Sequence, residues 1–134
     1  MIWYLILFVC IRVHSWLKLG LYMTDCLFCR IVRGELPSKK TYEDEDVLVF
    51  HDIHPIAPVH LLLIPKLHVE SLASCDTQHA TILSKLLLLA PKLALEHGLT
   101  EGFRTMINTG RGGGQEVFHL HLHVFGGGER IPKI

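Results

Sequence analysis

The sequence predicts an α+β domain built on an antiparallel sheet. About five short segments are rich in β-prone residues, and one long segment, 76–97, repeats its apolar residues with the period of a helix. No regular alternation of strand and helix links them, as a parallel sheet would require. With 134 residues, 49 % of them hydrophobic, the chain has the material for one domain with a packed core.

The first expected elements are a short helix and two strands. Apolar residues fall on one side of a helix over 26–32, and Gly34 and Pro37 follow it as helix-ending residues. A short strand is expected over 39–43. A second strand is expected over 46–52, because the residues at its centre are β-prone and charged residues flank it.

The middle of the chain predicts a buried strand and then the long helix. The strand covers 60–64 and ends at Pro65. Asp76 is a suitable N-cap for the helix, and Gly98 is a suitable C-cap. Pro91 lies inside the helical pattern, so we expect it to kink the helix or break it locally.

Two more strands complete the sheet. They are expected over 103–108 and 117–125, and the loop between them, 109–114, contains four glycines. Leu88 and Leu89 widen the apolar face of the long helix beyond one stripe, and a second subunit is the natural cover in so small a domain. We therefore expect a homodimer.

Residues 1–22 form an apolar extension that we separate from the domain at 23–134. The run from Ile2 to Ile11 is shorter than the roughly 20 residues that a membrane-spanning helix needs. Positive charge follows the run, and no small-residue cleavage site is present, unlike a secretory signal. We expect Met23 to be the natural start and no membrane association, with a weak membrane anchor as the alternative.

Charge and cysteine content narrow the class of function. Thirteen Lys and Arg residues balance thirteen Asp and Glu residues, which argues against binding to polymeric nucleic acid. Four cysteines are too few and too scattered for a disulfide framework, so we expect a reducing, cytoplasmic setting.

Three of the ten histidines share one short segment. On a strand, His119, His121 and His123 would lie on one face, and the core would receive the alternate residues Leu120, Leu122 and Val124. Such a row suits either a catalytic zinc site or phosphate chemistry, in which a neutral imidazole attacks phosphorus. The glycines just before the segment favour phosphate, because glycine-rich backbone can turn N–H groups toward an anion.

At this point the sequence resembles the histidine-triad (HIT) superfamily. Residues 114–125 (GQEVFHLHLHVF) are similar to its signature, and the segments 25–32, 50–60 and 64–68 agree in order and spacing. The glycines at 126–128 resemble the Hint-type branch of histidine-triad nucleotide-binding proteins, the purine nucleoside phosphoramidases.

The resemblance implies a HIT-like fold and a nucleotide-binding homodimer. Its sheet would have about five antiparallel strands with one long and one short helix. It would cleave the P–N bond of purine nucleoside 5′-phosphoramidates through a nucleotidyl group on His121. His123 would bind the phosphate and protonate the leaving amine, His60 would orient the catalytic imidazole, and His119 would complete the catalytic set.

The resemblance also implies the nucleotide contacts. Asp52 would accept the ribose hydroxyls, with His51 at the edge of the base pocket. The pocket itself would be lined by Leu27, Phe28, Ile31, Phe50 and Ile53. The phosphate would be surrounded by Asn108, Gly114, Gln115, Glu116 and Val117, although the role of the Glu116 carboxylate stays open.

Relatives with a C-x-x-C pair imply a structural zinc site. Its ligands here would be Cys26, Cys29, His68 and His119, and two free thiols are the alternative. No cofactor is expected for catalysis. Three other functions remain open: a nucleotide-binding regulatory module with little turnover, a dinucleoside polyphosphate hydrolase of the sister branch, and a hydrolase with the triad on zinc. The leaving amine and the choice between adenine and guanine are not readable from the sequence.

Overall fold

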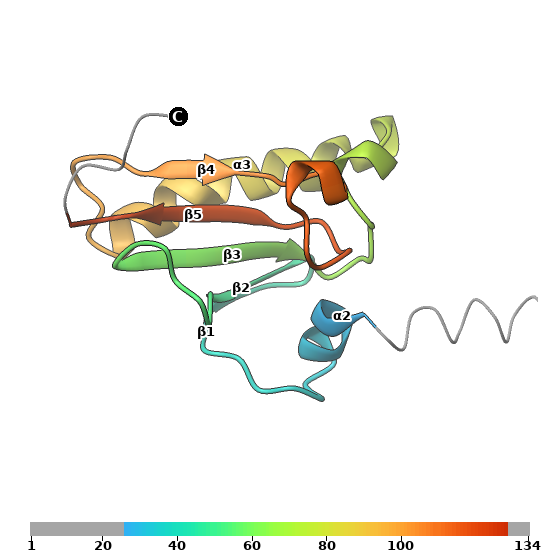
Figure 1. The fold of residues 1–134 in the computed structure, drawn as a ribbon, viewed down its shortest axis with the longest axis horizontal. Helices are drawn as coiled ribbons and strands as arrows, with labels where there is room; N and C mark the ends of the chain where they lie inside the picture. The colour runs from blue at the N-terminus through green and yellow to red at the C-terminus, as the bar shows by residue number, and fades with distance from the viewer. Residues whose placement is uncertain (1–25, 129–134) are drawn as a thin grey trace, which may run out of the picture.

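A computed structural model describes residues 26–128 and contains one five-stranded antiparallel sheet in the order β1-β2-β3-β5-β4 (Figure 1). Its strands are β1 (Lys40–Glu43), β2 (Val47–His51), β3 (Val59–Pro65), β4 (Arg104–Met106) and β5 (Leu122–Gly126). The predicted α+β class and the antiparallel sheet are confirmed. The expectations for residues 1–22 concern residues outside the described range. Within the described range, no helix has the length and hydropathy to cross a bilayer.

Within residues 26–128, two α-helices and three short 3-10 turns accompany the sheet. They are α2 (Leu27–Val32), α3 (Ala80–Glu96), η1 (Leu72–Ser74), η2 (Thr77–His79) and η3 (Arg111–Gly113). The Asp76 cap is present, but it caps η2, so α3 begins one turn later than the sequence predicts. Gly98 follows the helix with a φ of +81°, a left-handed conformation that glycine adopts without strain.

Helix α3 runs without interruption through Pro91, so of the two expected effects the local break is wrong, and the kink stays a prediction. Proline has no N–H to donate to the carbonyl of Leu87, one turn earlier. The Leu87 side chain is 53 % exposed, so that carbonyl lies on the water-facing side of the helix. Ala90, Leu93 and Ala94 around the proline are buried in the core, and their packing offsets the lost hydrogen bond.

The sheet separates two hydrophobic clusters. On one face, Val47 and Val49 of β2 pack with Leu61 and Leu63 of β3 under α3. On the other face, the alternate residues of the same strands, including Leu48, pack with Phe28 and Ile31 of α2. Figure 1 shows α3 behind β4 and β5, and α2 near the end of the sheet where β3 finishes and β5 begins. The second face is covered by the short helix α2, and His60, His121 and His123 lie there.

The last strand is shorter than predicted. β5 begins at Leu122, so His119 and His121 precede it in irregular backbone. The His119 N–H donates to the Val117 carbonyl (2.9 Å) and the Leu120 N–H donates to the Val69 carbonyl (2.6 Å), so neither joins a strand ladder. The expected alternation still holds, because the core cluster under α3 contains Leu120, Leu122 and Val124.

The two leucines behind the dimer expectation have different surroundings. Leu89 is buried in the core of its own chain, whereas Leu88 is 75 % exposed. The core of the same chain therefore covers part of the apolar face of α3, and a second subunit is not needed for that part. Leu87, Leu88 and Leu95 are the large apolar residues of this helix that are exposed.

Candidate active site

A pocket of about 580 Å³ opens on the sheet face that α2 covers. Its apolar wall comes from α2, from the connection after it and from β2, and its polar end comes from β5, the residues before it and the glycine loop. The predicted residues that line it are Leu27, Phe28, Ile31, Phe50, His51, Asp52, Ile53, Asn108, Gly114, Glu116, Val117, His121 and His123. An apolar slot thus ends at two imidazoles.

Five further residues line the pocket without having been predicted. They are Leu36, Pro37, Ser38, His54 and Leu62. Leu36 and Pro37 lie in the connection after α2. In β3, Leu62 lies on the pocket face of the sheet, opposite to the core residues on either side of it. Of these five residues, only Leu62 could have been found from the sequence. The two-residue alternation of a strand places it on the face opposite to Leu61 and Leu63.

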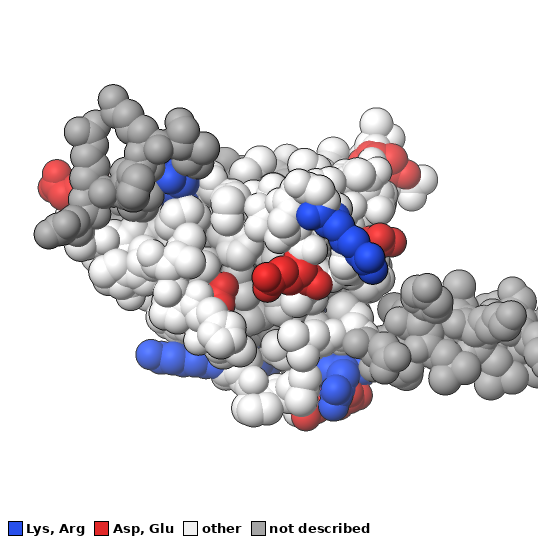
Figure 2. Space-filling view, viewed as in Figure 1, with Lys and Arg blue, Asp and Glu red and all other residues white. Residues whose placement is uncertain are grey.

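The lining of the pocket has acidic groups but no Lys or Arg among the described residues. Its charged side chains are the carboxylates of Asp52 and Glu116. The face in Figure 2 is largely uncharged, with acidic and basic side chains in small separate groups. This distribution agrees with the balanced net charge of the sequence, and it lacks the basic stripe of a nucleic-acid-binding surface.

His121 is held by a backbone carbonyl. Its Nδ1 lies 2.6 Å from the carbonyl oxygen of His119, an atom that only accepts hydrogen bonds, so Nδ1 carries the proton. Nε2 is then left with a lone pair. Burial lowers the pKa of His121, so the ring is neutral near pH 7. A neutral imidazole with a free Nε2 is the form that acts as a nucleophile.

His60 and His123 form an ordered pair beside it. The Ile56 N–H donates to Nδ1 of His60 (3.2 Å), so the proton of neutral His60 resides on Nε2. That N–H lies 2.9 Å from Nδ1 of His123, which must accept it. The proton of His123 is therefore on Nε2. Burial, together with the neighbouring His121 and His60 imidazoles, lowers the pKa of His123 to about 4.

Two buried side-chain atoms of the described residues have no hydrogen-bond partner, and both belong to residues that line this pocket. They are Nε2 of His123 and the hydroxyl oxygen of Ser38. An unsatisfied buried polar group is costly, and such groups recur where a ligand supplies the partner. The orphan N–H of His123 is thus a donor suited to a phosphate oxygen or a leaving group.

Asp52 has two different carboxylate contacts. Its Oδ1 accepts the N–H of His54 (2.8 Å), which fixes the turn after β2. Its Oδ2 lies 3.5 Å from Nε2 of His60. His51, the preceding residue, has its ring 5.5 Å from that of His97 at the end of α3, so the His51 side chain lies on the opposite face of the sheet. His51 is nevertheless among the residues that line the pocket.

The glycine loop is folded on itself. The N–H groups of Gly113, Gly114 and Gln115 donate to carbonyls of Gly110 and Arg111, so these three do not point together toward an anion as expected. Gly110 and Gly114 have φ values of +68° and +76°, a backbone conformation that residues other than glycine rarely adopt.

Gln115 does not line the pocket; its buried side chain instead fixes the loop. Its Oε1 accepts the N–H of Gly110 (2.8 Å), and its Nε2 donates to the carbonyls of Glu70 (2.7 Å) and Val117 (3.1 Å). The predicted phosphate role is therefore not a direct contact of the side chain. Gln115 positions Gly114, Glu116 and Val117, which do line the pocket.

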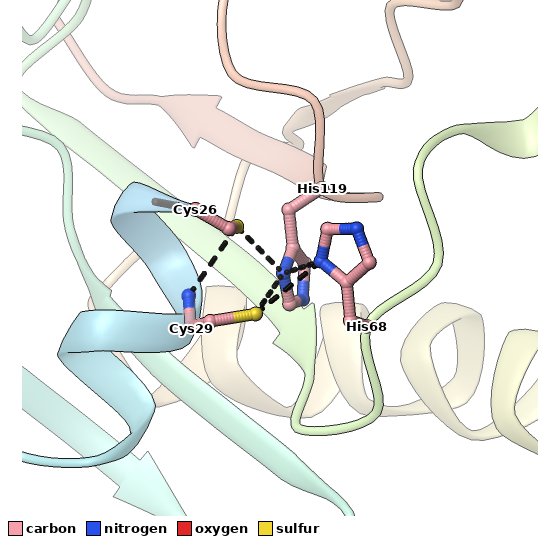
Figure 3. Close-up of side chains that lie close together, drawn as sticks. All are labelled: Cys26, Cys29, His68 and His119. Carbon is pink, nitrogen blue, oxygen red and sulfur yellow. Dashed lines mark hydrogen bonds between the residues drawn. The ribbon is translucent and has the colours of Figure 1, made fainter. Parts of the chain in front are cut away.

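Four predicted metal ligands come together next to the pocket (Figure 3). Cys26 and Cys29 come from α2, His68 follows β3, and His119 precedes β5. Nδ1 of His119 lies 3.5 Å from each sulfur and 3.2 Å from Nδ1 of His68, which is 3.3 Å from the sulfur of Cys29. We call these four residues the Cys/His cluster.

The Cys/His cluster fits a zinc ion. Tetrahedral zinc with bonds of about 2.0 to 2.3 Å keeps its ligand atoms roughly 3.3 to 3.8 Å apart, close to the spacing of this set. Nε2 of His119 donates to the carbonyl of Pro65 (2.8 Å), which leaves a lone pair on Nδ1 toward the other ligands. Burial and the neighbouring Cys26 thiol raise the pKa of Cys29 to about 11, and a bound cation favours the thiolate instead.

A second group, formed by Asp52, His60 and His123, has metal-like spacing but the wrong proton arrangement. A neutral histidine that binds a metal through Nε2 carries its proton on Nδ1. Nδ1 of His60 accepts the Ile56 N–H instead. The triad also does not converge on one centre, because the His119 ring belongs to the Cys/His cluster.

Comparison with known proteins gives the same family along most of the chain. The model of the HIT domain matches residues 33–130. Protein HitA of Neisseria gonorrhoeae is 53 % identical over 104 residues, covering 78 % of this chain and 97 % of HitA. The purine nucleoside phosphoramidase of Escherichia coli (strain K12) is 39 % identical over 111 residues (82 % and 93 %), and a 14 kDa zinc-binding protein of Zea mays is 45 % identical over 103 residues (75 % and 80 %).

Solved structures agree with the fold. A HIT family hydrolase from Legionella pneumophila Philadelphia 1 has a TM-score of 0.76 at 44 % identity, covering 78 % of this chain and 95 % of that one. A zinc-bound histidine triad family protein from Mycobacterium smegmatis has a TM-score of 0.68 at 36 % identity (77 % and 72 %). The chain belongs to the HIT domain family.

Proposed function

We propose that this protein hydrolyses the P–N bond of purine nucleoside 5′-phosphoramidates through a nucleotidyl group carried on His121. It is a hydrolase of the HIT family. The observation that carries the proposal is the hydrogen bond from Nδ1 of His121 to the His119 carbonyl. That bond leaves a lone pair on Nε2 of a neutral imidazole that lines the pocket.

In the first step, Nε2 of His121 attacks the α-phosphorus and forms a P–N bond to the imidazole. The bond from phosphorus to the leaving amine breaks, and the amine takes up a proton from water. The Nε2–H of His123, which has no partner within residues 26–128, can donate a hydrogen bond to a phosphate oxygen or to the departing nitrogen and so stabilise both as the bond breaks. His60 holds His123 in this tautomer through the 2.9 Å contact.

In the second step, water attacks the same phosphorus and the bond to His121 breaks. The products are a nucleoside monophosphate and the regenerated imidazole, with the proton of water passing to solvent or to a neighbouring base. Splitting one displacement into two lets a single histidine serve as nucleophile and then as leaving group. The hydrogen bond to the His119 carbonyl keeps the ring aligned through both steps.

The rest of the pocket suits a purine nucleoside. Phe28 and Phe50 have their ring centroids 5.5 Å apart and, with Ile31, give an apolar slot for a flat base. The Asp52 carboxylate at the edge of this slot is an acceptor for ribose hydroxyls. No feature here chooses between adenine and guanine.

Charge favours a phosphoramidate over a dinucleoside polyphosphate. A phosphoramidate ester of a nucleoside carries one negative charge at phosphorus, whereas a polyphosphate bridge carries several. The pocket offers two carboxylates and no cationic Lys or Arg among its described lining residues, so each added negative charge meets repulsion. The sister-branch reaction is therefore the weaker candidate.

We propose a structural role for zinc at the Cys/His cluster and no cofactor in the chemical steps. The cluster supplies all four ligands, which leaves no open position of the kind that catalytic zinc keeps for water. We also propose a homodimer in the cytoplasm. The exposed Leu87, Leu88 and Leu95 of α3 would gain cover in a dimer, and metal-binding thiols persist in a reducing compartment.

The test follows amine release from adenosine 5′-phosphoramidate esters, together with the intact mass of protein quenched during turnover. We expect release by the parent chain and a mass increase of one adenylyl group that maps to His121. His121→Ala should lose both signals, while His79→Ala, a change before α3 and outside the pocket lining, should keep them. Release without an adduct, or an adduct that survives in His121→Ala, would remove the proposed mechanism.

One outcome favours the regulatory-module alternative. If the parent chain binds AMP but releases no amine from any ester tried, the pocket is a nucleotide-binding site without turnover. Sedimentation or light scattering measures the oligomeric state separately, and a monomer would contradict the proposed dimer.

A further inference from the structure

We propose that the Cys/His cluster positions the nucleotide pocket, so that metal and nucleotide strengthen each other's binding. The choice of nucleotide in this inference rests on the proposed function. The contacts between the cluster and the pocket do not depend on that function. The cluster and the pocket share two pieces of backbone, the helix α2 and the segment 119–121. Each piece carries metal ligands on one side and pocket residues on the other.

His119 is the first connection. Its ring is fully buried and lies in the cluster, with Nδ1 toward Cys26, Cys29 and His68. Its own carbonyl accepts the Nδ1 proton of His121 at 2.6 Å. A bond to Nδ1 of His119 therefore restrains the residue whose carbonyl orients the candidate nucleophile. His119 is thus a positioning residue rather than a group that touches substrate.

Helix α2 is the second connection. It has only six residues, Leu27–Val32, and helices shorter than about 12 residues are marginal in isolation. Cys26 is its N-cap and Cys29 lies in its first turn, so both sulfurs tether the start of the helix. Between them stands Phe28, whose ring centroid lies 5.2 Å from that of His121 and 5.9 Å from that of His119.

Phe28 connects the cysteine ligands to the wall of the pocket. It is 5 % exposed and packs edge-on against His119, His121 and Phe50, while lining the cavity that we assign to the base. Joining α2 to His68 and His119 fixes Phe28 against the sheet. When the four ligands are not joined, α2 is held by the apolar contacts of Phe28 and Ile31 and by the loop after it.

The consequence is a reciprocal coupling of two binding equilibria. If zinc fixes the pocket in its binding form, AMP binds more tightly to the zinc-loaded chain. By linkage, AMP must then raise the affinity for zinc by the same factor. Couplings of this kind are typically about 5- to 150-fold, so we expect a ratio of at least about fivefold.

The experiment measures both halves of the cycle on the full chain. Calorimetry gives the Kd of AMP for zinc-loaded and for chelator-stripped protein, and competition with a zinc indicator gives the Kd of Zn²⁺ with and without AMP. Cys29→Ser should behave like stripped protein in AMP binding. Cys75→Ser is the matched control, because Cys75 lies outside the cluster and its thiol contacts the Ser71 carbonyl.

A second readout needs no nucleotide. Nitrogen-15 NMR of the imidazoles reports the Nδ1–H of His121, and aromatic resonances report the Phe28 ring. We expect zinc to shift and sharpen both sets of signals, and re-addition of zinc after stripping to restore them. Circular dichroism of each state shows whether the chain is still folded, and reversible stripping takes the place of any variant that is not.

Equal AMP affinities with and without zinc, or unchanged His121 and Phe28 signals, would overturn the coupling. Matching ratios in the two halves of the cycle would support it. If AMP binds neither state, the proposed function fails, and the NMR comparison alone then decides the coupling. The two proposals are in this way separated.

Discussion

Replacing Gln115 by alanine tests how the glycine loop is held. The change removes three hydrogen bonds, one from the Gly110 N–H and two to the carbonyls of Glu70 and Val117. Gln115 is 4 % exposed, so water cannot readily replace them. At a net value of about 1 kcal/mol each, the free energy of unfolding should fall by about 3 kcal/mol.

Urea unfolding followed by circular dichroism measures this loss, with an unchanged m-value as the sign that the unfolded state is the same. Gln78→Ala is the matched control, because Gln78 is exposed and its change should stay within about 0.5 kcal/mol. Gln115→Ala should also raise KM, since Gly114, Glu116 and Val117 would no longer be fixed beside the pocket. A loss below about 1 kcal/mol would refute the account of Gln115 as the residue that holds the loop.

Three further predictions concern α3, pH and charge. Pro91→Ala should raise the free energy of unfolding, measured by urea titration, by about 2 kcal/mol. The change relieves about 3 kcal/mol of helix penalty and loses about 1 kcal/mol because the unfolded chain becomes more flexible. A free energy of unfolding that does not rise would contradict the account of the uninterrupted helix. Because burial and the neighbouring imidazoles lower the pKa of His123 to about 4, its ring should stay neutral as pH falls through about 6.5, and an NMR titration of this imidazole should show protonation only toward pH 4. A midpoint near the ordinary histidine pKa would contradict that reading of the pair with His60. Glu116→Gln should raise kcat/KM for diadenosine polyphosphates relative to phosphoramidates by up to about fivefold, from about 1 kcal/mol of repulsion in water, and equal effects on both substrates would argue against a charge-based preference.

Much of the fold was predictable because its core is regular. β2 and β3 carry β-prone residues whose alternation separates two faces, and Leu120, Leu122 and Val124 continue that alternation before and within β5. The boundaries were less predictable. Whether His119 and His121 belong to a strand depends on what their backbone pairs with, and Leu120 pairs with the loop residue Val69.

The site followed from the sequence only in part. The spacing of the three histidines predicted their common face. The Cys/His cluster, in contrast, joins Cys26 to His119 across 93 positions, and spacing alone did not identify those partners. The resemblance to the family supplied them. Ser38 as a lining residue of the pocket, and the role of Gln115 in fixing the loop, were not predicted, because both depend on how the loops pack rather than on any local pattern.

The order of the strands has a consequence for how the protein acquires its site. Besides β2, β3 pairs with β5 and not with β4, the next strand in sequence, and this pairing brings His60 and His123 together across 63 positions. Such distant contacts form slowly, because a long chain segment must be closed before the contacts stabilise it. During synthesis, β5 is also the last of the five described strands to leave the ribosome. The hydrophobic face under α3 can begin to collapse earlier, but the row of imidazoles assembles only when the final strand is laid between β3 and β4.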